Sequence, residues 1–151
     1  VPLNIEIIAG HRLGWIGPSV FQQSLLATGA LLWGDRAALD SVPNWRPEQI
    51  DPRDALDEMG CAERHLADGN GVLAAHRAAG ALLIARRTYT AHPGDWATRL
   101  SRVWPEAPET DSMSPQQFVA GARALLEDWL FTWEGSGMSK DAIKQFEALR
   151  K

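Results

Sequence analysis

The residue types that most often hold metals or act as nucleophiles are sparse in this chain. It contains four histidines and one cysteine, which are His11, Cys61, His65, His76 and His92. A structural zinc site needs four such ligands brought together at characteristic spacings. Because the histidines form no plausible ligand set with one another or with the single cysteine, we predict no metal site.

One spacing could support cleavage of RNA. Arg87 and His92 are separated by Thr-Tyr-Thr-Ala, which fits an Arg-x4-His pattern and resembles the motif of HEPN-type helical ribonucleases. In such a site the arginine stabilises the phosphate and the histidine transfers a proton during attack by a 2′-hydroxyl group. The simpler interpretation is a solvated helix end that carries favourable positive charge, and we prefer it.

The amino-acid composition indicates which class of protein carries these histidine and arginine residues. A chain of 151 residues with 45% hydrophobic and 23% charged residues is typical of one globular domain. Its net charge of −4 disfavours nucleic acid as the main partner and suits a cationic ligand better. A single cysteine, short apolar stretches and an N-terminus without a leader pattern predict a cytoplasmic protein with no membrane span.

The elements predicted along the chain are mostly helical. Residues 1–9 alternate apolar and polar side chains and are typical of one β-strand. From Pro18 onward, apolar residues recur at helical spacing between proline, glycine and capping signals, which predicts a bundle of about five to seven helices. We therefore expect a mainly α fold in two parts, a strand and loop over residues 1–17 and a helical domain over residues 18–151.

Several helix limits carry specific signals. Asp51, Asp95 and Ser114 each precede an apolar periodic run and are predicted N-caps, and Gln117 completes a capping box with Ser114. Another helix is expected to run from Val72 to about Tyr89. These predicted limits would place Asp95 at the start of one helix and His92 just beyond the end of another.

The predicted strand from Leu3 to Ile8 has no partner strand in the rest of the sequence. Unpaired backbone donors and acceptors are costly, and an exposed apolar strand templates association. We therefore expect its partner strands upstream of Val1 or on another chain, with self-association through this strand or poor order at the N-terminus.

Four segments, taken in order and spacing, resemble the aminoglycoside adenylyltransferases that modify streptomycin and spectinomycin. They are L-N-I-E-I-I at 3–8, T-G-A-L-L-W-G-D at 28–35, G-V-L-A-A-H-R at 71–77, and D-W-A at 95–97 followed by R-L at 99–100. The resemblance covers most of the chain up to Pro105. It identifies residues 1–17 as the last strand and loop of a truncated α/β nucleotidyltransferase domain.

The resemblance implies a reaction and a set of roles. The complete enzyme would transfer AMP from ATP, with Mg²⁺, to a hydroxyl group of an aminoglycoside-like cation. Glu6 would act as general base on that hydroxyl, Asp95 and Trp96 would contact the cationic substrate, and Arg77 would contact the nucleotide phosphates. Trp15, in a predicted loop, could stack on the same substrate.

Each of these residues also has a structural interpretation. Glu6 could be a polar residue on the solvent-exposed face of a strand, and Asp95 is favoured as a helix cap. Trp96 is favoured as a core residue and Trp15 as a cover for a helix end. Arg77 is favoured as a member of an ion pair.

The chain departs from the family at the nucleotide site. The superfamily holds ATP and magnesium with a Gly-Ser turn followed by two aspartates on the next strand, and no such pair exists in this sequence. In the family the pair lies ahead of the strand that residues 3–8 resemble. We therefore expect the chain alone to be inactive and to bind ATP-magnesium negligibly. A non-catalytic helical binding module that pairs with a separate nucleotidyltransferase chain remains a third hypothesis.

Overall fold

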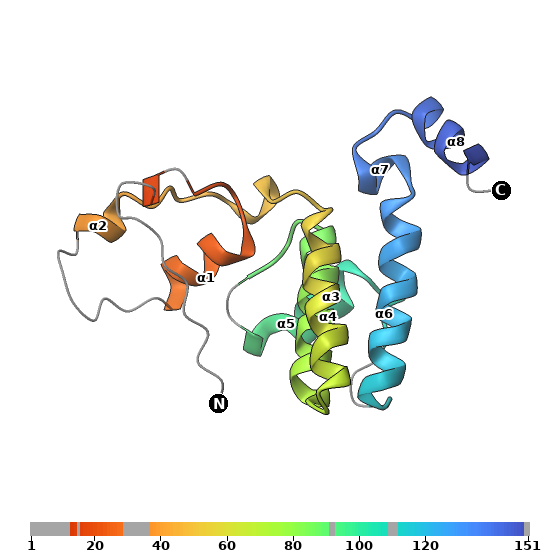
Figure 1. Ribbon diagram of the computed structural model, residues 1–151, viewed down its shortest axis with the longest axis horizontal. Helices are drawn as coiled ribbons and strands as arrows, with labels where there is room; N and C mark the ends of the chain where they lie inside the picture. Colours follow the sequence, from red (N-terminus) through yellow and green to blue (C-terminus); the bar gives the residue numbers. More distant parts are fainter. Residues whose placement is uncertain (1–12, 15, 29–36, 91–92, 109–111, 150–151) are drawn as a thin grey trace.

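The computed structural model describes residues 13–14, 16–28, 37–90, 93–108 and 112–149, and every element in these ranges is helical (Figure 1). The predicted mainly α architecture is confirmed at this level. The predicted strand from Leu3 to Ile8 lies outside the described residues. None of the described helices is long and apolar enough to cross a membrane.

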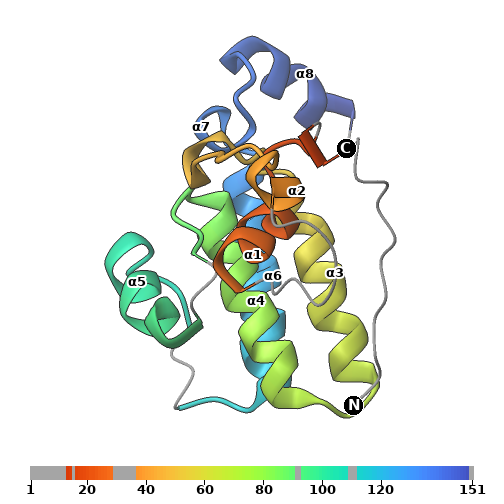
Figure 2. The ribbon, with the colours of Figure 1, turned by 90° about the vertical axis from the view of Figure 1, so that its left-hand side faces the viewer.

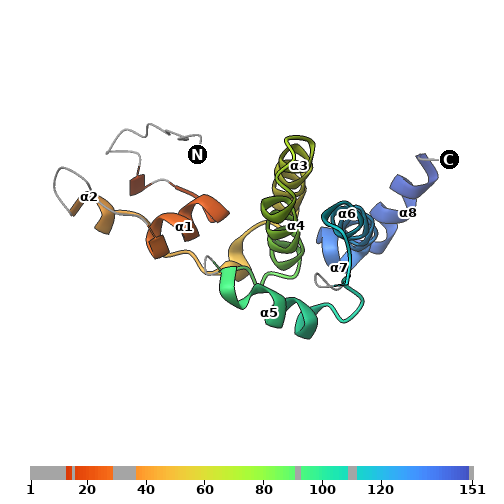
Figure 3. The same cartoon turned by 90° about the horizontal axis from the view of Figure 1, so that it is seen from below.

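Three long helices form the body of the protein. They are α3 (Asp54–Ala67), α4 (Gly71–Ala85) and α6 (Pro115–Leu130), and they lie side by side in all three views (Figures 1, 2 and 3). The short helix α5 (Trp96–Val103), preceded by the 3-10 turn η3 (Pro93–Asp95), packs against α4. These contacts make α4 the central helix.

The sequence of α4 explains this central position. All residues from Ala78 to Ala85 are buried, so the second half of the helix is covered on every side. Most of them are alanines or the glycine Gly80, whose small side chains let the neighbouring helices approach closely. The larger core side chains come from α3, α4 and α6 together: Met59, Leu82, Leu83, Ile84, Phe118 and Leu126.

Two of the predicted helix limits illustrate the success and the failure of local signals. The capping box of α6 is present: the Ser114 hydroxyl accepts from the Gln117 amide at 3.3 Å, and the Gln117 side chain accepts from the Ser114 amide at 3.0 Å. The predicted N-cap of α3 is wrong by two residues, because the helix begins at Asp54 with Arg53 at the N-cap position. Asp51 instead accepts a hydrogen bond from the Arg53 amide in a preceding turn.

The remaining elements lie at the two sides of the body. The helices α1 (Val20–Thr28) and α2 (Ala37–Asp40) and the turn η2 (Pro47–Gln49) form the N-terminal side, and α7 (Trp133–Ser136) and α8 (Lys140–Leu149) lie at the C-terminal side (Figure 1). The buried Gln22 ties α1 to the following segment by donating to the carbonyl of Pro43 at 2.9 Å.

Candidate functional site

The end of α4 has an unusual backbone. The helix stops at Ala85, earlier than the predicted end near Tyr89, because Arg87 adopts a left-handed conformation with φ of 57°. The amide of Thr88 donates to the carbonyl of Leu83 at 2.9 Å and that of Arg87 to Ile84 at 2.8 Å. This pair of bonds is a Schellman motif, in which the left-handed position is usually glycine.

The same motif closes α3 with the usual residue. Gly69 has φ of 78°, its amide donates to Leu66 at 3.1 Å, and the amide of Asn70 donates to His65 at 2.8 Å. Left-handed backbone costs a residue with a side chain about 1–2 kcal/mol, and glycine is free of this cost. After α4 the chain has Arg87 at the left-handed position, where a glycine such as Gly69 after α3 would be more stable.

The neighbouring Arg86 packs against two aromatic rings that also contact each other. Its guanidinium carbon lies 4.4 Å from the centre of the Trp129 ring and 5.4 Å from that of Trp104. The indole nitrogen of Trp129 donates to the carbonyl of Ala85 at 3.2 Å, which ties α6 to the end of α4. Cation–π contacts contribute about 0.5–2 kcal/mol each, so Arg86 packs as part of the structure.

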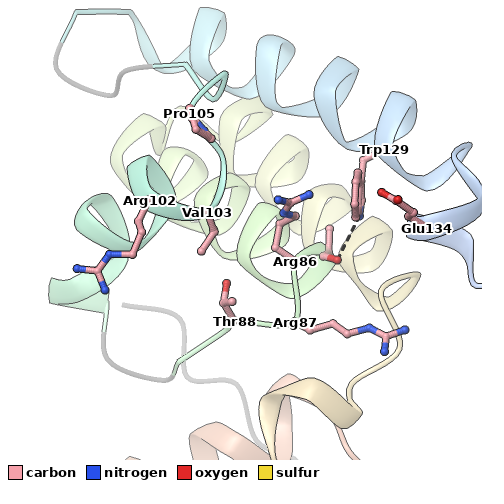
Figure 4. A pocket seen from close by; sticks show the side chains of 9 residues that line it. Arg86, Arg87, Thr88, Arg102, Val103, Pro105, Trp129 and Glu134 are labelled. Atoms are coloured by element: carbon pink, nitrogen blue, oxygen red, sulfur yellow. Dashed lines mark hydrogen bonds between the residues drawn. The ribbon is translucent and has the colours of Figure 1, made fainter.

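These residues form one wall of an open pocket of about 710 Å³, shown from close by in Figure 4. The pocket brings together the end of α4, the end of α5, Trp129 of α6 and the beginning of α7. Its lining comprises Ala85, Arg86, Arg87, Thr88, Arg102, Val103, Pro105, Trp129 and Glu134.

The pocket is rich in positive charge. Three arginines line it, against the single carboxylate of Glu134. In Figure 4 the three guanidinium groups point in different directions, with Arg86 beside Trp129 and Arg87 directed toward the other side of the α4 end from Arg102. Within the described part of the chain, none of the three forms an ion pair. Such a surface is suited to anions, because guanidinium groups bind phosphate and carboxylate oxygens through paired hydrogen bonds.

Arg87 also lines a second, smaller hollow of about 260 Å³ next to the start of α3. Asp51 lies in that hollow and forms an ion pair with Arg53 at 2.6 Å. The Arg53 hydrogen bond holds the pKa of Asp51 below its ordinary value, and the charge of Arg87 adds a smaller effect in the same direction. Arg87 therefore lines both hollows.

The ion pair expected of Arg77 is present and lies away from the pocket lining. Arg77 Nη1 on α4 donates to Glu58 Oε1 on α3 at 2.8 Å. Burial tends to lower the pKa of Arg77, but the hydrogen bond and charge of Glu58 outweigh it and leave the pKa raised. The structural interpretation of Arg77 is confirmed, and its phosphate contact stays a prediction.

The two residues of the Asp-Trp-Ala segment differ in exposure. Asp95 is exposed at the N-cap position of α5, but its carboxylate makes no capping hydrogen bond. The predicted capping role is wrong because the backbone there is helical (φ −95°, ψ −5°), whereas a capping side chain needs extended backbone to reach the first turn. No capping hydrogen bond to α5 therefore orients the carboxylate of Asp95.

Trp96 is a core residue, as its apolar periodicity predicts. Its side chain is 7% exposed, and its indole nitrogen donates to the carbonyl of Thr90 at 2.8 Å. A Cβ atom added at Gly80 of α4 would lie 3.1 Å from the ring, so the contact leaves no room for a ligand between ring and helix. Glu6, Trp15 and His92 lie outside the described residues, so their predicted roles are not placed.

The sequence hypotheses missed the pocket itself. Arg86, Arg102 and Trp129 come to the pocket from the ends of α4 and α5 and from α6, which are far apart in the sequence. The one available signal was local: two arginines follow α4 where a glycine is the usual helix stop. Among the described residues, no group of three or more histidine, cysteine, aspartate or glutamate side chains is arranged to hold a metal ion.

Comparisons of the chain with protein-family profiles, with curated proteins and with solved structures found no match.

Proposed function

We propose that this chain is the helical part of a nucleotidyltransferase that resembles the aminoglycoside adenylyltransferases. When complete, the enzyme would transfer AMP from ATP to a hydroxyl group of an aminoglycoside-like cation in the cytoplasm. The observation that supports this proposal is the arginine-lined pocket between α4, α5 and α7, since a nucleotide presents phosphate groups to its binding site.

The pocket fits the phosphate part of the cofactor and leaves the metal to another part of the enzyme. Arg87 and Arg102 are exposed and carry guanidinium groups without an ion-pair partner in the described ranges, and Thr88 adds a hydroxyl group. Magnesium would be held by a catalytic half with a Gly-Ser turn followed by an Asp-x-Asp pair, and no Asp-x-Asp pair stands in this sequence. Bound magnesium supplies charge neutralisation on the phosphates during transfer.

A calorimetric titration of the chain with tripolyphosphate and with ATP tests the phosphate site. We expect weak, salt-sensitive binding of both anions that magnesium reduces, because the metal neutralises the charge that the arginines attract. Absence of binding by either anion at millimolar concentration would overturn the assignment of the pocket. Micromolar binding that requires magnesium would contradict the expectation that the metal site lies elsewhere.

Asp95 is the candidate contact for the cationic acceptor. Its exposed carboxylate makes no capping bond, so Asp95→Asn removes the charge without removing a cap. In the protein completed by its catalytic half, the affinity for streptomycin or spectinomycin should fall roughly ten- to a hundredfold, with an unchanged melting temperature. Equal affinity of the variant and the wild type would remove Asp95 from the acceptor site.

One observation supports the alternative function, cleavage of RNA. Arg87, the first residue of the Arg-x4-His pattern, lines the open pocket. Incubation of the chain with single-stranded RNA decides between the two functions. Metal-independent cleavage that is lost in both Arg87→Ala and His92→Ala would favour the HEPN-type activity over nucleotidyl transfer.

A further inference from the structure

The two arginines that follow α4 have different surroundings. Arg86 is half-buried and packed against Trp104 and Trp129, so its position is explained by the fold. Arg87 is exposed, and no ion pair holds its side chain within the described part of the chain. The packing of the fold therefore accounts for Arg86, whereas the interaction described for Arg87 is limited to the effect of its charge on nearby Asp51.

The backbone conformation at residue 87 makes an arginine at this position unexpected. Arg87 occupies the left-handed position of a Schellman motif, with φ of 57°, while α3 of the same chain uses Gly69 at the equivalent position. Glycine would satisfy the same hydrogen bonds without steric cost. Backbone strain at a residue without a structural task is a feature of ligand-binding sites.

The location of Arg87 indicates a role in ligand binding. It lines both the larger pocket and the smaller hollow beside α3, and Figure 4 shows its side chain extending away from the end of α4. Resting on the proposed function, we propose that Arg87 is the ligand-binding arginine of the pocket. It binds an anionic ligand of the phosphate class in the larger pocket.

This assignment separates a binding residue from a packing residue at adjacent positions. Reversal of the chain at residue 87 directs its side chain away from the aromatic rings that surround Arg86. The left-handed turn thus lowers the stability of the protein and places an exposed guanidinium group at the pocket. Stability and anion affinity should then respond to residue 87 in opposite directions.

The chain offers a matched control for this test. Arg87→Gly removes the side chain and the strain, whereas Gly69→Arg introduces the same strain at α3, where an added Cβ atom meets nothing within 4 Å. Arg87→Lys keeps both the positive charge and the left-handed residue. The three variants and the double variant Gly69→Arg/Arg87→Gly are compared by thermal melting and by calorimetric titration with tripolyphosphate.

We expect Arg87→Gly to raise the melting temperature by about 2–4 °C and to weaken tripolyphosphate binding at least roughly tenfold. Gly69→Arg should lower the melting temperature by a similar amount with unchanged binding, and the double variant should melt like the wild type and bind weakly. Arg87→Lys should melt like the wild type and retain part of the affinity. Wild-type affinity in Arg87→Gly would overturn the assignment of Arg87 alone, whereas absence of binding by the wild type would overturn the proposed function and this inference together.

Discussion

The ion pair between Glu58 and Arg77 is the best-defined link between α3 and α4. The Glu58 side chain is 9% exposed and accepts a hydrogen bond from Arg77 at 2.8 Å. The Arg77 side chain is 40% exposed, so solvent screens part of the interaction. The pair is thus intermediate between a surface salt bridge and a fully buried one.

Arg77→Met retains the apolar stem, removes the charge and leaves the buried carboxylate without its partner. A hydrogen bond to a charged group contributes about 1.5–3 kcal/mol, and a stranded buried charge costs about 3–5 kcal/mol. Because Arg77 is partly exposed, we expect a loss of about 2–3 kcal/mol in the free energy of unfolding. Glu58→Gln should cost less, about 1 kcal/mol, since the amide oxygen still accepts from Arg77.

Urea unfolding of the two variants and of the double variant measures the coupling between the residues. Arg123→Met is the matched control, because Arg123 joins α6 to α3 through Glu63 at 3.5 Å with both side chains more than one-third exposed. That control should lose less than about 1 kcal/mol. If Arg77→Met loses no more stability than Arg123→Met, burial does not strengthen the Glu58 ion pair as we have argued.

Three further substitutions test local features. Ser114→Ala should lower the free energy of unfolding by about 1 kcal/mol, since it removes the hydroxyl of the α6 capping box; an unchanged urea midpoint would contradict this. Gly135→Ala should cost roughly 2–4 kcal/mol and alter tryptophan fluorescence, because the added Cβ would lie 2.1 Å from the carbonyl oxygen of Trp129; a wild-type melting curve and spectrum would show that α7 moves freely. Arg53 lowers the pKa of Asp51, so this carboxylate stabilises the fold above its unfolded pKa and loses that effect as pH falls through the folded value. Asp51→Asn should therefore cost less than about 1 kcal/mol at neutral pH and nothing at a pH well below the folded pKa of Asp51, and a difference that persists there would refute the ion-pair origin.

Local sequence determined the features that depend on neighbouring residues along the chain. The capping box of Ser114 and Gln117 forms within one helical turn, so its residues are sufficient to predict it. The apolar periodicity of α3 and α6 likewise predicts helices with one buried face. The core position of Trp96 follows from the same periodicity.

Tertiary structure decided the features in which a local preference competes with a distant contact. The end of α4 lies at Ala85 although the helical pattern continues beyond it, and Trp129 bonds to that end from 44 residues away. The pocket depends on the same long-range packing, because Arg86 meets Trp104 and Trp129 only when α4, α5 and α6 are assembled. Asp95 occupies its predicted cap position, yet the turn before α5 sets a helical backbone that keeps its carboxylate from capping. Residue types along the chain thus predict where helices form, whereas packing between helices decides where they stop and which side chains meet.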